Sequence, residues 1–458
     1  MSPEITPPNT VDVSAIIEQQ RLSSFLVALV VISWIITFFD GYDMNVIGFA
    51  APYFAKELDL TRLMLGNVFS IGTFGLLVGG FLFGYLGDRI GRRPSIILTT
   101  LLFGLFTLLL AFATSYASLL GLRFCVGVAA GGMLPLSWAL NLEYAPKRYR
   151  ATVVTLIMIG YSLGVAVGGP ISNWLAPRHG WQAIFVFGGV LSLISGCALF
   201  LLLPESIRFL ASHRRGAEVI ARTLRRVAPT VTIPPNADFV VADEEGHSKS
   251  FGPSMLFLGD LAWITPLLWI AYIFSSMAAF FLASWTPIVF EALHFTRADA
   301  AWAGTLVSAS GAIGGLSLMR FTDTRGAIAI TVMPLAAIPL LIATGFIDFG
   351  YAEIFVATAL IGFTVFGGHY GMHTLAGLYY PSAYRANGTG WATSVAKIGS
   401  IAGPWIGGVI LSTSLPARNI FALLALCPAA VMICVFLIGR IHSRILGEER
   451  ARAAQLAA

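Results

Sequence analysis

Charged residues are scarce in this chain, which has 23 acidic and 28 basic side chains among 458 residues, or 11%. Hydrophobic residues make up 57% of the sequence. A water-soluble domain cannot bury so large an apolar fraction in one core, because its surface needs many more charges. The shortage of charge therefore excludes a soluble globular protein, and the lipid bilayer becomes the expected surrounding of most of the surface.

Cysteine is also rare, and the motifs of metal and nucleotide sites are missing. The chain has neither CxxC spacing nor a GxxxxGKS or GxxxxGKT segment, which argues against a zinc site and against ATP-driven transport. We expect no metal and no cofactor. We interpret the cysteines as small hydrophobic side chains; they are Cys125, Cys197, Cys427 and Cys434.

The net charge of +5 does not indicate nucleic-acid binding, because the basic residues are spread over particular loops instead of forming one patch. They follow the second, fourth and sixth apolar runs, which places them on one side of the membrane if the helices alternate. Such a bias marks the cytoplasmic side. We therefore expect both termini in the cytoplasm. The location that we expect is a bacterial inner membrane. The residues are Arg89, Arg92, Arg93, Lys147, Arg148, Arg150, Arg214, Arg215, Arg222, Arg225 and Arg226.

Apolar runs long enough to cross a bilayer recur along the whole chain. A helix needs about 20 residues for this, at about 1.5 Å per residue. The sequence predicts twelve such spans, at residues 24–54, 66–86, 96–114, 117–140, 152–172, 182–203, 263–290, 300–320, 327–347, 352–378, 387–412 and 419–440.

The two halves of the chain repeat each other in one ungapped register that runs from the first span through the fifth. Asp88 and Arg150, for example, match Asp323 and Arg385 at the same offset. Duplicated halves of this kind hold their substrate between them, near the midplane. We expect an all-α membrane protein with two pseudo-symmetric six-helix bundles and a few short helices in otherwise mobile linker chain. The expected division is a cytoplasmic segment 1–23, bundles 24–203 and 263–440, a cytoplasmic linker 204–262 and a cytoplasmic tail 441–458.

The first span carries two carboxylates inside an apolar run, Asp40 and Asp43. An ionisable residue at this depth indicates a functional site, because an ion is costly in hydrocarbon. The i, i+3 spacing puts both on one helix face, where they would share a site for protons. The alternative is a hydrogen-bonded kink at Gly41.

The loop after the second span reads GYLGDRIGRRP, from Gly84 to Pro94. This pattern resembles the gate motif of the major facilitator superfamily. Gly84 would permit close helix approach, and Asp88 would cap a helix or pair with a nearby arginine, forming a latch that breaks on conformational change. Plain positive-inside anchoring is the alternative for the arginines. The second copy of the motif, which contains Asp323, has lost most of its charge, so its latch should be weaker. The arginines are Arg89, Arg92 and Arg93.

The segment Asp40-Gly41-Tyr42-Asp43, the run Glu143 to Pro146 and the pair Tyr384-Arg385 resemble the aromatic acid:proton symporters of that superfamily. The resemblance covers the whole chain and implies transport of a benzoate-like anion. It also implies that transport requires Asp40, Asp43, Asp88, Arg92 and Arg385. We add Glu143 to the proton-coupling residues, Arg150 to the gating residues, and Tyr42 and Asn45 to the substrate-binding residues.

Two further cations lie within apolar spans. Arg123, in the fourth span, resembles the proton-coupling motif and should lie in the outer half of the membrane, as Asp43 does. The two could pair, which would favour the ionised carboxylate until they separate. The alternative is that Arg123 snorkels to the surface.

Lys397, in the eleventh span, is our candidate for binding the substrate carboxylate, unless an acidic partner on another helix neutralises it.

His369 and His373 have i, i+4 spacing in the tenth span. No further metal ligands are evident, so a proton relay or a hydrogen bond to substrate is the better interpretation, with simple packing as the alternative for either residue. Aromatic side chains near the expected cavity could stack on a benzene ring. Among them we include Tyr370 and Trp391 in the substrate site.

The sequence thus predicts a transporter and not an enzyme: a monomer that imports an aromatic carboxylate with protons. The nearest alternative keeps the fold and changes the cargo to a sugar, an aliphatic carboxylate or an exported compound. A non-transporting membrane sensor is more distant, because the chain keeps its buried charges and carries no added signalling domain. A membrane enzyme would rest only on the histidines and carboxylates.

Overall fold

The computed structural model describes residues 10–20, 23–228, 231, 233–234, 237–241, 253–325, 327–380 and 385–457. Within these ranges the side chains of 151, 253, 319–325, 327–329, 373–374, 376–378, 385–386, 442 and 445–457 are not described.

Eleven helices in the described part of the chain are long and apolar enough to span a bilayer, and a shorter apolar helix, Ile330–Phe346, supplies the twelfth. The predicted twelve-helix fold is therefore confirmed. The first half contains α2 (Ser24–Glu57), α3 (Arg62–Ile90), α4 (Arg92–Leu110), α5 (Tyr116–Tyr144), α6 (Arg150–His179) and α7 (Gln182–Leu202). The second half contains α11 (Leu261–Ala292), α12 (Arg297–Arg325), α13 (Ala327–Phe346), α14 (Tyr351–Tyr379), α15 (Arg385–Leu411), α16 (Asn419–Leu424) and α17 (Leu426–Ala457).

Hydroxyl side chains begin several of the long helices. Ser23, Thr61 and Ser115 each accept a hydrogen bond from the backbone N–H three residues later, at the start of α2, α3 and α5. Such caps satisfy N–H groups that have no partner within the helix. Gly91 separates α3 from α4 with a φ of 107°, a conformation that favours glycine. The local sequence thus sets where these helices start and turn.

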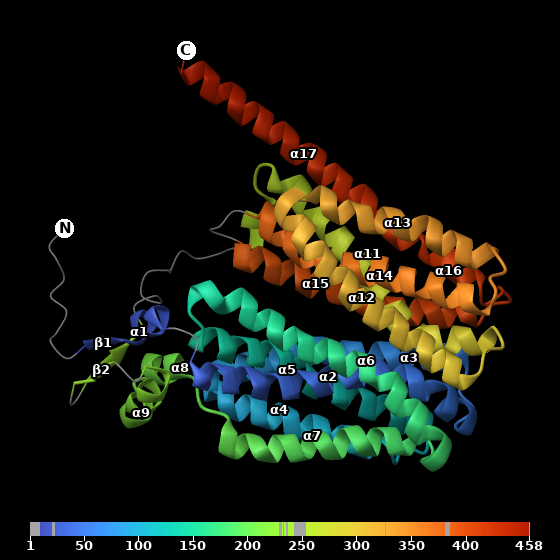
Figure 1. Ribbon diagram of the computed structural model, residues 1–458, viewed down its shortest axis with the longest axis horizontal. Coiled ribbons are helices and arrows are strands. Elements are labelled where there is room, and N and C mark those ends of the chain that lie inside the picture. The colour runs from blue at the N-terminus through green and yellow to red at the C-terminus, as the bar shows by residue number, and fades with distance from the viewer. Residues whose placement is uncertain are drawn as a thin grey trace.

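The two halves form two helix bundles that repeat the same internal packing (Figure 1). In the first half α2 packs on α6, α3 on α5 and α4 on α7. In the second half the equivalent pairs are α11 with α15, α12 with α14 and α13 with α17. The sequence repeat is therefore a repeat of helix packing as well.

Glycine allows the α2–α6 pair and its counterpart to approach closely. A Cβ atom on Gly164 would collide with the backbone carbonyl of Phe38. At the equivalent position of the second half, a Cβ on Gly399 would collide with the carbonyl of Ile273. Small residues of this kind let membrane helices pack backbone to backbone.

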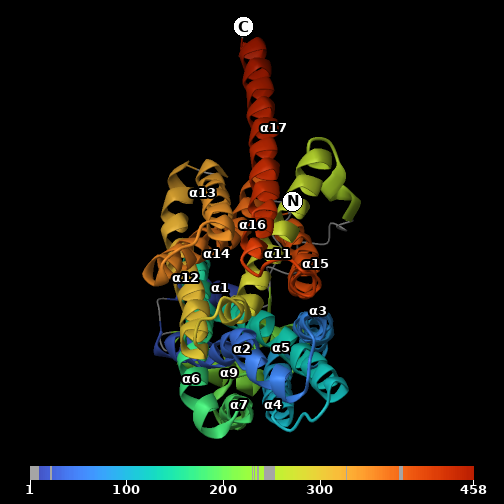
Figure 2. The same ribbon diagram turned by 90° about the vertical axis from the view of Figure 1, so that its right-hand side faces the viewer.

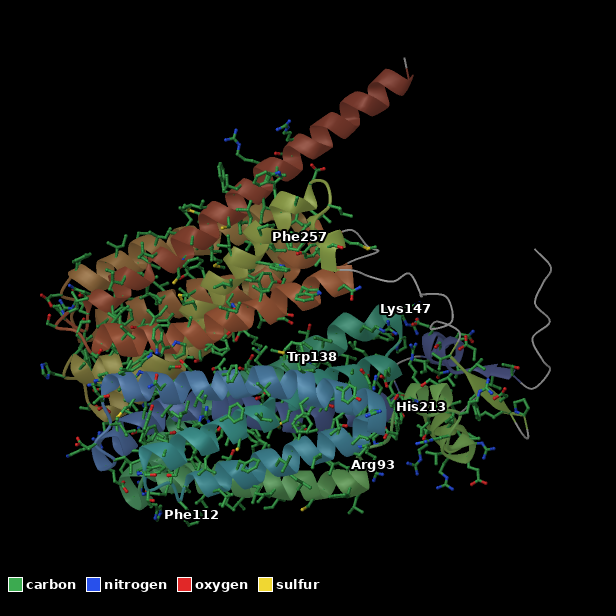
Figure 3. The ribbon with its side chains drawn as sticks, turned by 180° about the vertical axis from the view of Figure 1, so that it is seen from behind. Arg93, Phe112, Trp138, Lys147, His213 and Phe257 are labelled. Carbon is green, nitrogen blue, oxygen red and sulfur yellow. The ribbon has the colours of Figure 1, made fainter. Side chains whose placement is uncertain are left out.

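The ends of the bundles differ. We call the end formed by residues 88–93, 145–149, 203–228 and 237–241 the linker face, and the end formed by residues 58–61, 111–115 and 293–296 the opposite face. Arg93, Lys147 and His213 lie toward the linker face, and Phe112 lies at the other end (Figure 3). The ribbons of the two bundles diverge toward the linker face (Figure 1).

Contacts between the bundles gather toward the opposite face. Ser70 of α3 donates to the carbonyl of Ile401 of α15 at 2.8 Å. The rings of Phe69 and Trp285, from α3 and α11, are 5.3 Å apart and edge to face. Viewed from this end, the C-terminal bundle lies on the N-terminal bundle and α17 extends beyond both (Figure 2). The bundles therefore meet closely in the half of the molecule next to the opposite face.

The N-terminal segment and the linker form a small assembly on the linker face. Strand β1 (Thr10–Asp12) pairs in parallel with β2 (Asp238–Val240), an arrangement that the sequence did not lead us to expect. The helices α1 (Val13–Gln19), α8 (Ile207–Ser212) and α9 (Ala217–Val227) lie beside them, and a 3-10 turn, Pro253–Phe257, precedes α11. Val13, Ile17 and Leu224 are fully buried in one apolar cluster with residues of the N-terminal bundle. The linker is thus packed against the first bundle through its apolar side chains.

Candidate transport site and gates

A buried ion pair joins Asp43 of α2 to Arg123 of α5. Nη1 of Arg123 lies 2.9 Å from Oδ2 and 3.1 Å from Oδ1 of Asp43. The Arg123 side chain is 6% exposed and that of Asp43 is 8% exposed. Gly72 leaves room for the guanidinium, because a Cβ there would lie 3.2 Å from its nitrogens. Arg123 therefore turns inward to Asp43 and does not snorkel to the surface.

Asp40 and Lys397 come from different bundles and act on each other electrostatically. Asp40 of α2 is 6% exposed, and Lys397 of α15 is partly buried. Neither side chain makes a hydrogen bond or ion pair with another residue that the structure describes. The carboxylate and the ammonium thus influence each other from different bundles without a direct ion pair.

Tyr161 of α6 belongs to the same cluster, although the sequence did not single it out. Its phenol interacts electrostatically with Asp40, with Asp43 and with Tyr370 of α14. Gly41 packs against the Tyr161 backbone, which brings α6 close to the Asp40–Asp43 segment. The only signal in the sequence was a tyrosine beside the glycines of the fifth span.

His369 of α14 is hydrogen-bonded to Ser275 of α11, with 3.1 Å between Nδ1 and Oγ. Its ring centre is 6.1 Å from that of Tyr370. Ser275 was not among the predicted residues. The side chain of His373 lies outside the described residues, so its predicted part in the site stays a prediction.

Three predicted substrate residues make other contacts. The Tyr42 hydroxyl donates to the carbonyl of Ile184 at 3.2 Å, so its ring is turned toward α7. Asn45 donates to the hydroxyl of Ser308 of α12 at 2.7 Å, bridging the bundles. Trp391 is 42% exposed and stacks on another tryptophan of its own bundle. The structure does not bring these three together with Lys397, and their role in substrate binding stays a prediction.

The predicted latch residues form a network on the linker face. Asp88 pairs with Arg92 at 2.7 Å, and Nε of Arg92 lies 3.1 Å from Oε1 of Glu143. Glu143, which we grouped with the proton-coupling residues, thus contacts the gate motif. Arg89 lies over the ring of Tyr85, with 5.4 Å to its centre.

The prediction that Gly84 permits close helix approach in the latched state stays a prediction. A Cβ atom at Gly84 would have no heavy atom within 4 Å. The side chains of Asp323 and Arg385, in the second copy of the gate, lie outside the described residues.

Glu205 holds the start of α4 and was missed in the sequence. Its Oε1 accepts hydrogen bonds from the backbone N–H groups of Arg92 and Arg93, at 2.9 and 3.1 Å. The Tyr144 hydroxyl donates to the Glu205 carbonyl at 2.6 Å. A carboxylate at a helix N-terminus caps free donors and complements the helix dipole. Glu205 thereby joins the end of α7 to the gate motif.

Glu18 of α1 contacts the loop between α5 and α6. It accepts a hydrogen bond from the Lys147 N–H at 3.1 Å, and it lies 3.8 Å from Nη2 of Arg150. The predicted gating residue Arg150 therefore contacts the N-terminal segment. No motif in the sequence pointed to this contact between segments far apart in the chain.

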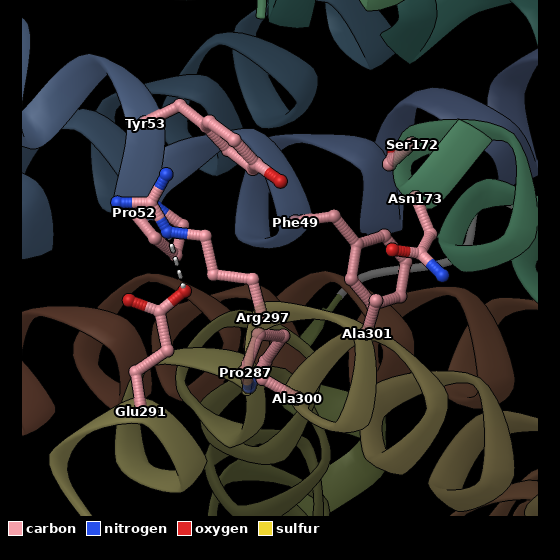
Figure 4. A pocket seen from close by; sticks show the side chains of 10 residues that line it. All are labelled: Phe49, Pro52, Tyr53, Ser172, Asn173, Pro287, Glu291, Arg297, Ala300 and Ala301. Atoms are coloured by element: carbon pink, nitrogen blue, oxygen red, sulfur yellow. Dashed lines mark ion pairs between the residues drawn. The ribbon is translucent and has the colours of Figure 1, made fainter. Parts of the chain in front are cut away.

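A second cluster joins the two bundles near the opposite face (Figure 4). The guanidinium of Arg297, on α12, lies 4.4 Å from the ring centre of Tyr53, on α2, and its Nε lies 3.5 Å from Oε1 of Glu291. Phe49 and Pro287 line the same hollow, whose volume is about 10 Å³. Such a hollow is the size of one water molecule and admits no organic solute.

The described side chains were also compared with what a metal site requires. Among the described residues no three His, Cys, Asp or Glu side chains are grouped so that they could hold a metal ion. In the described part of the membrane interior, the polar groups include the Asp43–Arg123 ion pair, the electrostatic interactions of Asp40 with Asp43 and Lys397, and hydrogen-bonding side chains.

The sequence and the fold both match known transporters. The family model described as Major Facilitator Superfamily matches residues 33–234 and 268–456. The 4-hydroxybenzoate transporter PcaK of Acinetobacter baylyi is 31% identical, over 94% of this chain and 95% of its own. PcaK of Pseudomonas putida is 33% identical, over 92% and 94%. The benzoate transport protein of Acinetobacter baylyi is 27% identical, over 93% and 92%.

A solved structure has the same fold. It is a bacterial homologue of the human lysosomal transporter Spinster, in an inward-facing and occupied conformation, with a TM-score of 0.64 at 15% identity over 93% of this chain and 96% of that one. The family model and the relatives above 30% identity cover nearly the whole chain. The chain therefore belongs to the major facilitator superfamily, in the family of aromatic acid transporters within it.

Proposed function

We propose that the protein imports an aromatic carboxylate together with protons, by alternating access between its two bundles. The observation that carries this proposal is the placement of Lys397 and Asp40 on different bundles, where they interact electrostatically without a direct ion pair. A substrate anion can take the ammonium as its counter-ion, while the carboxylate takes a proton. The relatives named for 4-hydroxybenzoate and benzoate support the aromatic class.

The substrate would lie between the bundles near the middle of the membrane. Its carboxylate would pair with Lys397, and its ring would lie between Tyr161 and Tyr370. Charge-assisted contacts fix orientation, and aromatic faces favour offset or edge contacts with a ring. A site assembled from both bundles is needed for alternating access, because each bundle must release its part of the ligand when they move apart.

Proton coupling would depend on the carboxylates Asp40 and Asp43. In this conformation the Asp43 carboxylate pairs with the Arg123 guanidinium at 2.9 Å. If the bundles rock and Arg123 withdraws, the unpaired carboxylate becomes costly in this apolar interior and takes up a proton. Asp40 interacts with both Asp43 and Lys397, so its charge would link proton binding to substrate binding.

The linker face is proposed to be cytoplasmic, with both termini on that side. Its support is the concentration of basic residues there, including Arg89, Arg148 and Arg225. With the opposite face closed around Arg297, this conformation would then open inward. The bundles 24–203 and 263–440 would move as rigid bodies in a monomer, with the latch of Asp88, Arg92 and Glu143 re-forming other contacts as the linker face closes.

Uptake by proteoliposomes tests the proposal. The panel is labelled benzoate, 4-hydroxybenzoate, a sugar and a dicarboxylate, under an inward proton gradient with and without protonophore. We expect uptake of an aromatic acid that the protonophore abolishes, and loss of that uptake in Lys397→Met. Preference for the sugar or the dicarboxylate would contradict the substrate class. Uptake of an aromatic acid that does not depend on the proton gradient would contradict proton symport.

A further inference from the structure

A surface hollow within the C-terminal bundle lies apart from the space between the bundles. It is formed on the opposite face by the loop between α11 and α12, the end of α13 and the loop before α16. We call it the loop hollow and define it by Leu293, His294, Phe346, Pro416 and Arg418. Its volume is about 390 Å³. Pockets that bind small organic molecules usually measure about 300–1,000 Å³, so this hollow is large enough for such a ligand.

The corresponding loop of the first half allows a comparison. Asp59 and His294 are separated by the constant offset of the repeat, and both have a positive φ, of 50° and 69°. Glu57 and Ala292, at the same offset, are the last residues of α2 and α11. The two loops therefore begin at equivalent places and turn in the same way, so the side chains around them can be compared directly.

A buried tryptophan fills this place in the first half. Trp181, which directly precedes α7, is 2% exposed, and its indole N–H donates to Oε2 of Glu57 at 2.7 Å. In the second half Arg418 directly precedes α16, which packs on α13 as α7 packs on α4. Ala292 stands at the equivalent of Glu57 and has no acceptor on its side chain. The loop hollow thus lies where the first half has the tryptophan and its partner.

Two basic side chains line the loop hollow. The ring of His294 makes no hydrogen bond or ion pair with any residue that the structure describes. Nη1 of Arg418 pairs with Oδ1 of Asp348, whose side chain is 88% exposed. An exposed ion pair is weak and a guanidinium has five N–H donors, so Arg418 can bind a second anion. No acidic residue is among the described residues that line the hollow, which therefore favours an anionic ligand.

Apolar side chains form another part of the wall. Leu293 and Pro416 line the hollow together with Arg418, and Phe346, at the end of α13, is 68% exposed. An aromatic ring packs favourably on apolar side chains and in offset or edge contact with another ring. Cationic and apolar side chains in one hollow match a ligand that carries a carboxylate on an aromatic ring.

We propose that the loop hollow is a second binding site for the aromatic carboxylate, with Arg418 and His294 contacting the carboxylate and Phe346 contacting the ring. The inference rests on the proposed function, which gives the class of ligand and makes the opposite face the side from which import begins. The loop 293–296 joins Glu291 to Arg297, the ion pair of the cluster that joins the bundles near this face. The second site therefore holds the acid next to the closed entrance.

Equilibrium dialysis of labelled 4-hydroxybenzoate against the full-length protein, in discs of a neutral phospholipid, counts the sites. The wild type should bind two molecules per chain. Lys397→Met should keep the molecule in the loop hollow, and Arg418→Gln should keep the molecule at the central site. Loss of a charged hydrogen bond weakens binding about tenfold to a hundredfold, so each variant should show one strong site instead of two.

A second variant and two controls separate loss of the site from misfolding. Ala292→Phe fills the loop hollow without removing a charge and should also reduce the count to one. Arg418→Lys keeps the positive charge and should keep two sites. Arg178→Gln removes an exposed arginine of the N-terminal bundle near the same face and should likewise leave two sites.

The outcomes distinguish the second site from the central one. A count that stays unchanged in both Arg418→Gln and Ala292→Phe would overturn the second site and leave the proposed function intact. A count that does not respond to Lys397→Met would instead contradict the central site of the proposed function.

Discs that contain an anionic phospholipid test the other source of a negative charge at this face. The count should remain two in these discs. A count that falls from two to one there would assign the loop hollow to a lipid headgroup and overturn the proposal.

Discussion

Arg123 and Asp43 form an ion pair inside the N-terminal bundle, 2.9 Å between Nη1 and Oδ2, with both side chains less than a tenth exposed. An isolated charge at this depth is much more costly than the pair, because neither water nor a second protein ion compensates it. Single substitutions, which leave one charge unpaired, and a double substitution, which removes both charges, should therefore affect the stability of the protein and its proton coupling differently.

Removing either partner alone should destabilise the protein by about 3–5 kcal/mol, the usual cost of leaving one buried charge unpaired. Asp43→Asn with Arg123→Gln together should recover part of this loss but no proton-driven uptake. Thermal unfolding in detergent and uptake under a proton gradient measure the two effects. A double variant as unstable as the sum of the single variants would show that the two residues are not energetically coupled.

Lys397→Met should raise the KM for the aromatic acid about tenfold to a hundredfold, because a charged hydrogen bond contributes about 1.5–3 kcal/mol. Lys397→Arg keeps the positive charge and should retain most of the affinity. Initial uptake rates over a range of substrate concentrations give the values. An unchanged KM in Lys397→Met would rule out this residue as the counter-ion of the substrate.

Arg297→Gln should weaken the closed state of the opposite face, since it removes the contact with Tyr53 across the bundles. A cation–π contact contributes about 0.5–2 kcal/mol, so opening should become more frequent by a few fold to about thirtyfold. The rate at which a membrane-impermeant maleimide labels Asn173→Cys, in a background without the four native cysteines, reports this opening.

Arg178→Gln is the matched control for Arg297→Gln. Arg178 is exposed near the same face and lies over a tryptophan of its own helix, 5.8 Å from the ring centre, so its contact does not join the bundles. Its substitution should leave labelling unchanged. Equal labelling rates in both variants would show that Arg297 does not hold the face closed.

Glu205→Ala should lower the stability by about 1 kcal/mol, the usual loss when a helix N-terminal cap is removed. It should also slow uptake, because α4 begins within the gate motif that Glu205 holds. Glu218→Ala, an exposed acidic residue on α9, serves as the control and should change neither property. Unfolding temperature and initial uptake rate are measured on the same preparations. Full uptake activity in Glu205→Ala would show that gating does not require this cap.

The sequence by itself determined the membrane class, the twelve spans and the two-fold repeat. These follow from run length and from a single constant offset between the halves, both of which are one-dimensional patterns. It also placed Asp43 and Arg123 at similar depth, because depth along a helix grows by a constant rise with each residue. The pairing of those two side chains in the structure agrees with that count.

Only the tertiary structure decided which helix faces meet. Tyr161, Ser275 and Glu205 carry no motif, and each acquires its contacts from a helix far away in the chain. Tyr42, within the motif segment, is instead turned toward α7. Periodicity gives the face and depth of a side chain on its own helix. The residue that this side chain contacts on another helix depends on how the helices pack and on the conformation of the two bundles. Neither is encoded by a single helix.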